Sequence, residues 1–138
     1  MFTLDLQWRR VHSEEPEDRV FPMRTFSDLY FFIVTLQRLR RAVTLATHVE
    51  SKAAELRAAL EEFDHSLPML KVMRNVGEHF DEYARDSTRR RHRDVDRRSL
   101  QVGAWDGRNY QWLDQTTDLQ AARESAKLLY AALRRVAN

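Results

Sequence analysis

The sequence predicts a mostly α-helical protein, an antiparallel bundle of four to five helices with a small β strand and a β-hairpin attached. Long stretches carry apolar residues at the three- and four-residue spacing of amphipathic helices. Only residues 2–8 and 99–113 show the patterns of strands. The length of 138 residues fits a single domain.

The N-terminal segment, residues 1–22, is expected to form a strand followed by a loop. Phe2, Leu4, Leu6 and Trp8 alternate with polar residues, and such a period of two is typical of a half-buried strand. A polar stretch around Pro16 follows, with acidic residues on both sides, and it predicts a loop.

Residues 25–85 contain the main helices. The sequence Thr25-Phe26-Ser27-Asp28 fits a capping box and predicts a helix start. Apolar residues at helical spacing then continue to residue 63 without glycine or proline. One helix of that length would span about 55 Å, which is long for a small domain. We therefore expect a break near residues 48–51.

A further helix is expected from Pro68 to about Arg85. Residues 64–66 interrupt the preceding pattern, and proline suits the first turn of a helix. On a helical wheel, one broad apolar arc must face the core. This arc consists of Leu70, Val72, Met73, Val76, Gly77, Phe80, Tyr83 and Ala84.

The polar side of this helix carries an arginine, an asparagine and a histidine. Arg74 and His79 lie at its two edges, about 140° apart. Asn75 is one turn before His79, and Arg74 is one turn before Glu78, so each pair can touch. Arginine is a permanent cation with a fork of donors for phosphate. Histidine can give or take a proton near neutral pH.

Residues 86–98 form a highly charged run with little to bury, which predicts a loop. Its arginines are candidates for charge contacts with an RNA backbone; they are Arg89, Arg90, Arg91 and Arg93. The alternative is a solvated loop without a ligand.

A β-hairpin is expected over residues 99–113. Two short apolar stretches, 100–102 and 110–112, flank Asp106-Gly107, a common hairpin turn. We expect this hairpin to pair with the N-terminal strand. Its aromatic residues beside Arg108 either stack a base or pack the hairpin against the helices; they are Trp105, Tyr110 and Trp112.

The last helix is expected over residues 117–137. Thr117-Asp118-Leu119-Gln120 fits a second capping box. A clear apolar stripe follows at helical spacing, formed by Leu119, Ala122, Ala126, Leu129, Leu133 and Val136.

Composition excludes several classes of site. The chain has no cysteine, so disulfides, thiolate nucleophiles and thiolate metal sites are excluded. The remaining histidines, His12, His48, His65 and His92, are scattered without ligand-like spacing, and we expect no metal. No glycine-rich phosphate loop or serine nucleophile elbow is present. We expect no cofactor.

The cations are mostly arginine. Lysine occurs only at Lys52, Lys71 and Lys127. Arginine favours planar, bidentate contacts with phosphate or carboxylate, although a high-GC genome would also enrich arginine codons. The net charge of +2 is small. No signal-peptide pattern or membrane-length apolar stretch is evident, so we expect a soluble cytoplasmic protein with no membrane partner.

Arg74-Asn75, followed by three residues and His79, resembles the motif of HEPN domains: an arginine, four to six residues of which the first is often polar, and a histidine. HEPN domains are helical bundles that typically dimerise through the motif helix. Many are metal-independent endoribonucleases, often toxins or antiviral effectors. The resemblance covers residues 25–136.

The resemblance implies a metal-free endoribonuclease that acts on RNA at a composite site in a homodimer, with a cognate antitoxin as a further partner. Arg74 would hold the scissile phosphate, His79 would act as general acid or base, and Asn75 would orient His79 or bind the phosphate. Glu78 and Tyr83 are secondary candidates. Glu78 is also the natural ion-pair partner of Arg74, and Tyr83 is also a natural core residue.

Two other functions stay open on the sequence alone. One is a non-catalytic HEPN-like helical dimer that binds a nucleotide or a partner protein. The other is an antitoxin-like or adaptor protein that uses the aromatic hairpin as its contact surface. Convergence of Arg74, Asn75 and His79 in a cleft favours the ribonuclease, whereas Arg74 paired with Glu78 on an open surface favours a binding module.

Overall fold

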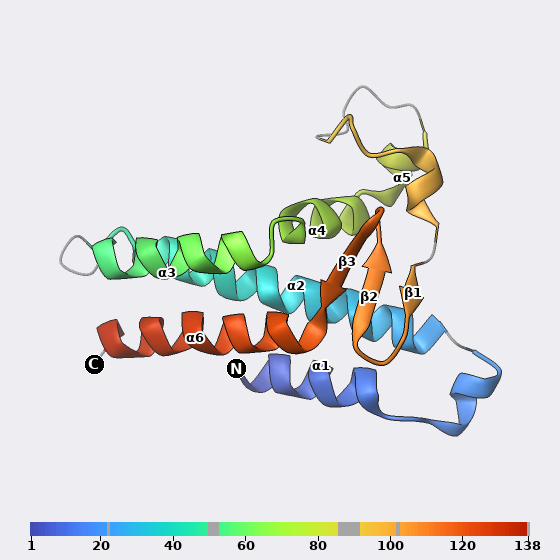
Figure 1. Cartoon of the computed structure of the whole chain (residues 1–138), viewed down its shortest axis with the longest axis horizontal. Coiled ribbons are helices and arrows are strands. Elements are labelled where there is room, and N and C mark those ends of the chain that lie inside the picture. The colour runs from blue at the N-terminus through green and yellow to red at the C-terminus, as the bar shows by residue number, and fades with distance from the viewer. Residues whose placement is uncertain (22, 50–52, 86–91, 102, 138) are drawn as a thin grey trace.

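A long central helix organises the fold. The computed structural model describes residues 1–21, 23–49, 53–85, 92–101 and 103–137. Helix α2 (Met23–Ala46) packs against α1 (Phe2–His12), α3 (Ala53–Ser66), α4 (Leu70–Glu78) and α6 (Leu119–Ala137) (Figure 1). The short helix α5 (Phe80–Ala84) follows α4. The remaining elements are the 3-10 helices η1 (Pro16–Arg19) and η3 (Arg97–Leu100) and the strands β1 (Ala104–Trp105), β2 (Asn109–Trp112) and β3 (Gln115–Asp118).

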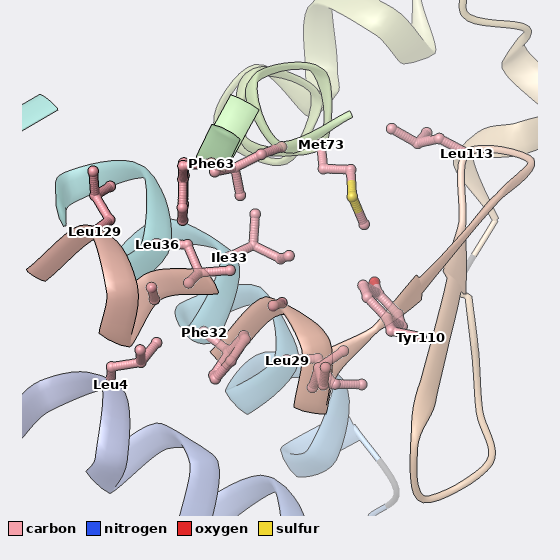
Figure 2. Close-up of a cluster of buried hydrophobic side chains, with 14 of the residues drawn as sticks. Leu4, Leu29, Phe32, Ile33, Leu36, Phe63, Met73, Tyr110, Leu113 and Leu129 are labelled. Atoms are coloured by element: carbon pink, nitrogen blue, oxygen red, sulfur yellow. The ribbon is translucent and has the colours of Figure 1, made fainter. Parts of the chain in front are cut away.

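The core lies between α2 and the elements around it. Phe32, Ile33 and Leu36 of α2 are at most 2% exposed. Around them lie side chains from the other helices and the sheet (Figure 2): Leu4, Phe63, Met73, Tyr110 and Leu129. Burial of apolar surface is the main favourable term in folding, and here it joins the helices and the sheet into one cluster.

The predicted N-terminal strand is wrong, because residues 2–12 form α1. Leu4 and Val11 are buried, and Trp8 packs on Phe32 with ring centroids 6.4 Å apart. These residues follow the helical spacing i, i+4, i+7. Phe2 and Leu6, which a strand would have buried with Leu4, are 77% and 38% exposed. The loop that follows contains η1.

The predicted capping box at Thr25 is also wrong. Helix α2 already includes Met23, whose carbonyl accepts a hydrogen bond from Ser27 Oγ. Asp28, 2% exposed, accepts hydrogen bonds from Arg10 Nε at 2.7 Å and from Arg24 Nη1 at 3.0 Å. A buried carboxylate needs such partners. Asp28 therefore links α1 to α2 and is not part of a helix cap.

The predicted break in the long helical stretch is confirmed. Helix α2 ends at Ala46 and α3 begins at Ala53, while residues 50–52 lie outside the described part. Helix α3 continues through residues 64–66, where an interruption was predicted. Pro68 lies in the turn before α4 and not in its first turn.

The helix predicted from Pro68 to Arg85 is two helices, α4 and α5, with a break at His79. The backbone of His79, at φ −123° and ψ 36°, leaves the helical region. Together with the helical N-terminus, this break gives six α-helices in the described residues, where four to five were predicted.

Only part of the charged run at 86–98 can be compared with its predicted loop, because residues 86–91 lie outside the described part. Residues 93 and 94 form a turn, and η3 begins at Arg97 with the Asp96 carboxylate accepting from the Arg98 N–H. Val95 within the run is buried at 9% exposure, so this run buries more than the sequence indicated.

The predicted hairpin is confirmed and is part of a larger sheet. Strands β1 and β2 pair antiparallel around Asp106-Gly107, where Gly107 has a φ of +95°. Its first strand begins at Ala104, later than predicted, and a third strand, β3, pairs with β2. The expected pairing with the N-terminal segment is wrong, because that segment is helical.

The last helix and its apolar stripe are confirmed. Leu119, Ala122, Ala126 and Leu129 are buried. The cap is Asp118, the last residue of β3, whose carboxylate accepts from the Ala121 N–H at 2.9 Å. The predicted capping box led by Thr117 is wrong, because α6 begins at Leu119. Within the described ranges, no helix is both long and apolar enough to cross a membrane.

Candidate functional site

The motif residues lie where α4 and α5 meet. Helix α4 packs on α2 (Figure 1). The apolar side of α4 is fixed in the core by Leu70, Met73 and Val76, which are at most 4% exposed. This burial sets the direction of the polar side chains on the same helix.

Arg74 forms the centre of the cluster. Its Nη2 pairs with the Glu78 carboxylate one turn later, as the spacing predicted. Its Nη1 donates to Asn75 Oδ1 at 3.0 Å. The Arg74 side chain is 14% exposed, so the guanidinium is partly covered but still reaches solvent. Its charge is balanced by Glu78 of the same chain.

Asn75 lies deeper than predicted. The wheel placed it on the polar side, whereas the residue is 3% exposed. Its Nδ2 lies 3.1 Å from His92 Nε2. With Oδ1 accepting from Arg74, the amide uses both of its polar atoms in protein contacts, as a buried amide requires.

His79 is separated from the other two motif residues by the break in the helix. Its imidazole side chain is 43% exposed, and Nδ1 lies 3.9 Å from a carboxylate oxygen of Glu82. Its link to Asn75 is through the backbone, since the His79 N–H donates to the Asn75 carbonyl at 3.0 Å. The predicted contact between the two side chains is wrong, because the wheel assumed an unbroken helix.

The other predicted residues of this helix divide between core and surface. Tyr83 is 1% exposed and is a core residue, and its hydroxyl accepts from the His92 backbone N–H at 3.3 Å. Phe80 was expected in the core but is 47% exposed. The break at His79 turns Phe80 away from the apolar side of α4.

Two residues that the sequence did not single out for this site belong to the cluster. His92 contacts Asn75 across 17 residues of chain, and no spacing rule indicates that contact. Tyr30 of α2 packs its ring on Gly77, where an added Cβ would lie 2.1 Å from Tyr30 Cε2. Burial raises the pKa of the Tyr30 hydroxyl, and nearby Glu78 raises it further, while Arg74 lowers it.

The predicted RNA-binding arginines are only partly described. Arg93 is exposed, directly after His92. Arg89, Arg90 and Arg91 lie outside the described residues.

The aromatic residues of the sheet pack within the protein. Tyr110 is 5% exposed and stacks on Trp112 with ring centroids 6.2 Å apart. Trp105 meets the edge of His12, with centroids at 5.6 Å. Arg108 pairs with Asp118 at 2.7 Å. These contacts confirm the packing interpretation for Tyr110 and Trp105.

Searches against models of protein families, against curated proteins and against solved structures found no match to this chain. The geometry of the cluster is therefore the basis for a functional proposal. Among the described residues, no group of three or more histidine or acidic side chains is arranged to hold a metal ion.

Proposed function

We propose that this protein is a metal-independent endoribonuclease of the HEPN type. The observation that carries the proposal is the position of Arg74 and His79 at the junction of α4 and α5. There the partly covered side chain of Arg74 contacts buried Asn75, and His79 exposes its imidazole at the helix break that follows. A guanidinium holds phosphate through paired hydrogen bonds, and an imidazole transfers protons near neutral pH.

In the proposed reaction, the ribose 2′-oxygen attacks phosphorus, and the bond from phosphorus to the 5′-oxygen breaks. One imidazole takes the proton of the 2′-hydroxyl, and another gives a proton to the leaving 5′-oxygen. The products are a 2′,3′-cyclic phosphate and a 5′-hydroxyl. Arg74 stabilises the charge that builds on the phosphate. The nucleophile is already part of the substrate, and DNA lacks it.

A homodimer through the α4 region supplies the two imidazoles as two copies of His79. Apolar residues around the cluster support this arrangement, because Phe80 beside His79 is 47% exposed and Phe31 beside Tyr30 is 53% exposed. Burial of such rings in an interface is favourable. Light scattering of the purified protein, with Phe80→Asp as a dissociating variant, tests the dimer.

A second candidate function is a non-catalytic helical dimer that binds a nucleotide or a partner protein. The pairing of Arg74 with Glu78 and with Asn75 favours it, because these contacts satisfy the guanidinium within one protomer. In this case Arg74 fixes Asn75 and has no substrate.

For the ribonuclease, we further propose a cytoplasmic role as a toxin or an antiviral effector, restrained by a cognate antitoxin protein. Growth arrest upon expression, relieved by His79→Ala, is the expected cellular result. Relief by His65→Ala instead, at an exposed position on α3, would contradict a role for His79.

The biochemical test uses a labelled single-stranded RNA, purified protein and excess EDTA. The wild type and the matched control His65→Ala are expected to cleave, and Arg74→Ala and His79→Ala are expected to lose most of the activity, on the order of a hundredfold or more. Equal cleavage by all four proteins would point to a contaminant. The binding function would be favoured if the wild type bound RNA without cleaving it and Arg74→Ala and His79→Ala lost this binding.

A further inference from the structure

Arg74 and His92 both contact the buried side-chain amide of Asn75. Arg74 Nη1 donates to Oδ1 at 3.0 Å, and His92 Nε2 lies 3.1 Å from Nδ2. The main chain of His92 is held as well, because its N–H donates to the hydroxyl of Tyr83, a residue only 1% exposed. Both the ring and the backbone of His92 are therefore anchored to the helices that carry the motif.

The donors and acceptors in this chain fix the state of the ring. A guanidinium only donates hydrogen bonds, so the Asn75 atom facing Arg74 must be the carbonyl oxygen. The amide nitrogen then faces His92, and it too only donates. His92 Nε2 must accept, so the ring is neutral and its proton is on Nδ1. A proton on Nε2 would place two donors 3.1 Å apart.

The same arrangement does not exist for His79. Its ring lies near Glu82, at 3.9 Å, and it makes no hydrogen bond with the Asn75 side chain. The role that the motif assigns to asparagine, to orient a histidine, is thus fulfilled toward a different histidine. The residue as a whole is half-buried.

We propose that His92 is a phosphate-binding residue of the ribonuclease site, held by Asn75 as the neutral Nδ1–H form so that this N–H donates to a phosphate oxygen of bound RNA. The inference rests on the proposed function for its substrate. It adds a neutral donor next to Arg74, and it changes the role of Asn75 from a partner of His79 to a positioning residue for His92.

The test is a substitution that keeps the hydrogen-bond acceptor at Nε2 and removes the donor at Nδ1. His92→Gln places an amide oxygen near the position of Nε2, where it can accept from Asn75, but it lacks the Nδ1–H donor. The probe is a single-stranded RNA with 2′-O-methyl groups, which binds but cannot be cleaved by 2′-oxygen attack. His92→Gln is expected to melt close to the wild type and to bind this RNA about tenfold more weakly, as for one hydrogen bond to a charged group. His65→Gln is the matched control and should bind like the wild type.

Binding by His92→Gln equal to that of the wild type would overturn the inference and leave His92 a structural residue. Binding of the probe by a wild type that cleaves no RNA would refute the ribonuclease, and the comparison with His92→Gln would then decide whether His92 contacts phosphate in a binding site without cleavage. A wild type that neither binds nor cleaves would refute both.

A second measurement applies if His92→Gln does not fold. Nitrogen-15 NMR of the wild-type histidine rings distinguishes protonated from unprotonated nitrogens. We expect His92 to carry its proton on Nδ1, and this nitrogen to shift when the 2′-O-methyl RNA is added. A proton on Nε2, or an unchanged Nδ1 in the presence of bound RNA, would overturn the inference.

Discussion

Arg74 and Glu78 form an ion pair across one turn of α4, in which the arginine side chain is 14% exposed and the glutamate 32%. A phosphate must compete with the Glu78 carboxylate for this guanidinium. Glu78→Gln removes the competing charge and is expected to raise RNA affinity about two- to fivefold, the range that corresponds to a partly exposed ion pair. Glu61→Gln, at an exposed position on α3, is the control. Unchanged or weaker binding by Glu78→Gln would show that Arg74 does not contact RNA.

Gly77 allows the Tyr30 ring to lie against α4. Replacement of a helical glycine by alanine normally stabilises a protein by about 1 kcal/mol. Here the new Cβ would lie 2.1 Å from Tyr30 Cε2, and we expect Gly77→Ala to destabilise by about 1–3 kcal/mol. Urea denaturation measures this change. In a Tyr30→Ala background the same substitution should stabilise; a loss of stability in both backgrounds would refute the proposed clash.

The arginine-rich segment is expected to contribute to RNA affinity through charge alone. We expect the joint replacement of Arg89, Arg90, Arg91 and Arg93 by glutamine to weaken binding at low salt. The slope of log affinity against log salt should fall by up to about 3, since each contact with single-stranded RNA contributes about 0.7.

The control for this measurement neutralises four exposed arginines elsewhere, so the change in net charge is the same; they are Arg9, Arg19, Arg57 and Arg134. Equal salt slopes for both quadruple variants would show that the segment at 89–93 is not part of the binding surface.

The stability of the sheet should depend on alkaline pH through Tyr110. Burial raises the pKa of its hydroxyl to about 12, against about 10 in an unfolded chain. Above pH 10 the unfolded state loses a proton that the folded state keeps. The free energy of unfolding therefore falls as pH rises from 10 to 12.

Tyr110→Phe lacks this proton, so its free energy of unfolding should fall less steeply over the same pH range. Denaturation curves of both proteins at several pH values measure the difference. Tyr30, whose pKa is also raised, contributes equally to both. Parallel pH dependences would show that Tyr110 is not desolvated in the folded state.

The sequence identified elements that depend on long, regular apolar patterns. The last helix and the hairpin at Asp106-Gly107 are confirmed because periodicity and turn chemistry are local properties. The break between α2 and α3 was predicted on a different ground, the length that one unbroken helix would have. The N-terminal helix was missed because the residues before Arg9 alternate as in a strand. The helical spacing is visible only when Val11 is considered together with Leu4 and Trp8. Its packing on α2 decides the matter.

Strand β3 was missed for a different reason. The turn that precedes it uses Leu113 and Asp114, both with positive φ, of 54° and 58°. Such conformations favour glycine or asparagine, so Leu-Asp gives no turn signal. Leu113 is 5% exposed, and its burial offsets the cost of this backbone conformation.

For the candidate site, the sequence located Arg74, its ion pair with Glu78 and the core position of Tyr83. It did not locate the partner of Asn75. The helix break at His79 is a change of one backbone conformation, and it moves the motif histidine away from the amide. The contact with His92 depends on how the chain returns after α5, which no local pattern indicates.

The most direct test of the proposed chemistry compares two oligonucleotides in excess EDTA: an RNA, and the same RNA with one 2′-deoxyribose at the mapped cleavage position. We expect cleavage of the first to a 2′,3′-cyclic phosphate and a 5′-hydroxyl, and no cleavage of the second at that position. Cleavage of both, or of neither by a folded dimeric protein, would contradict attack by the 2′-oxygen at the Arg74 and His79 site.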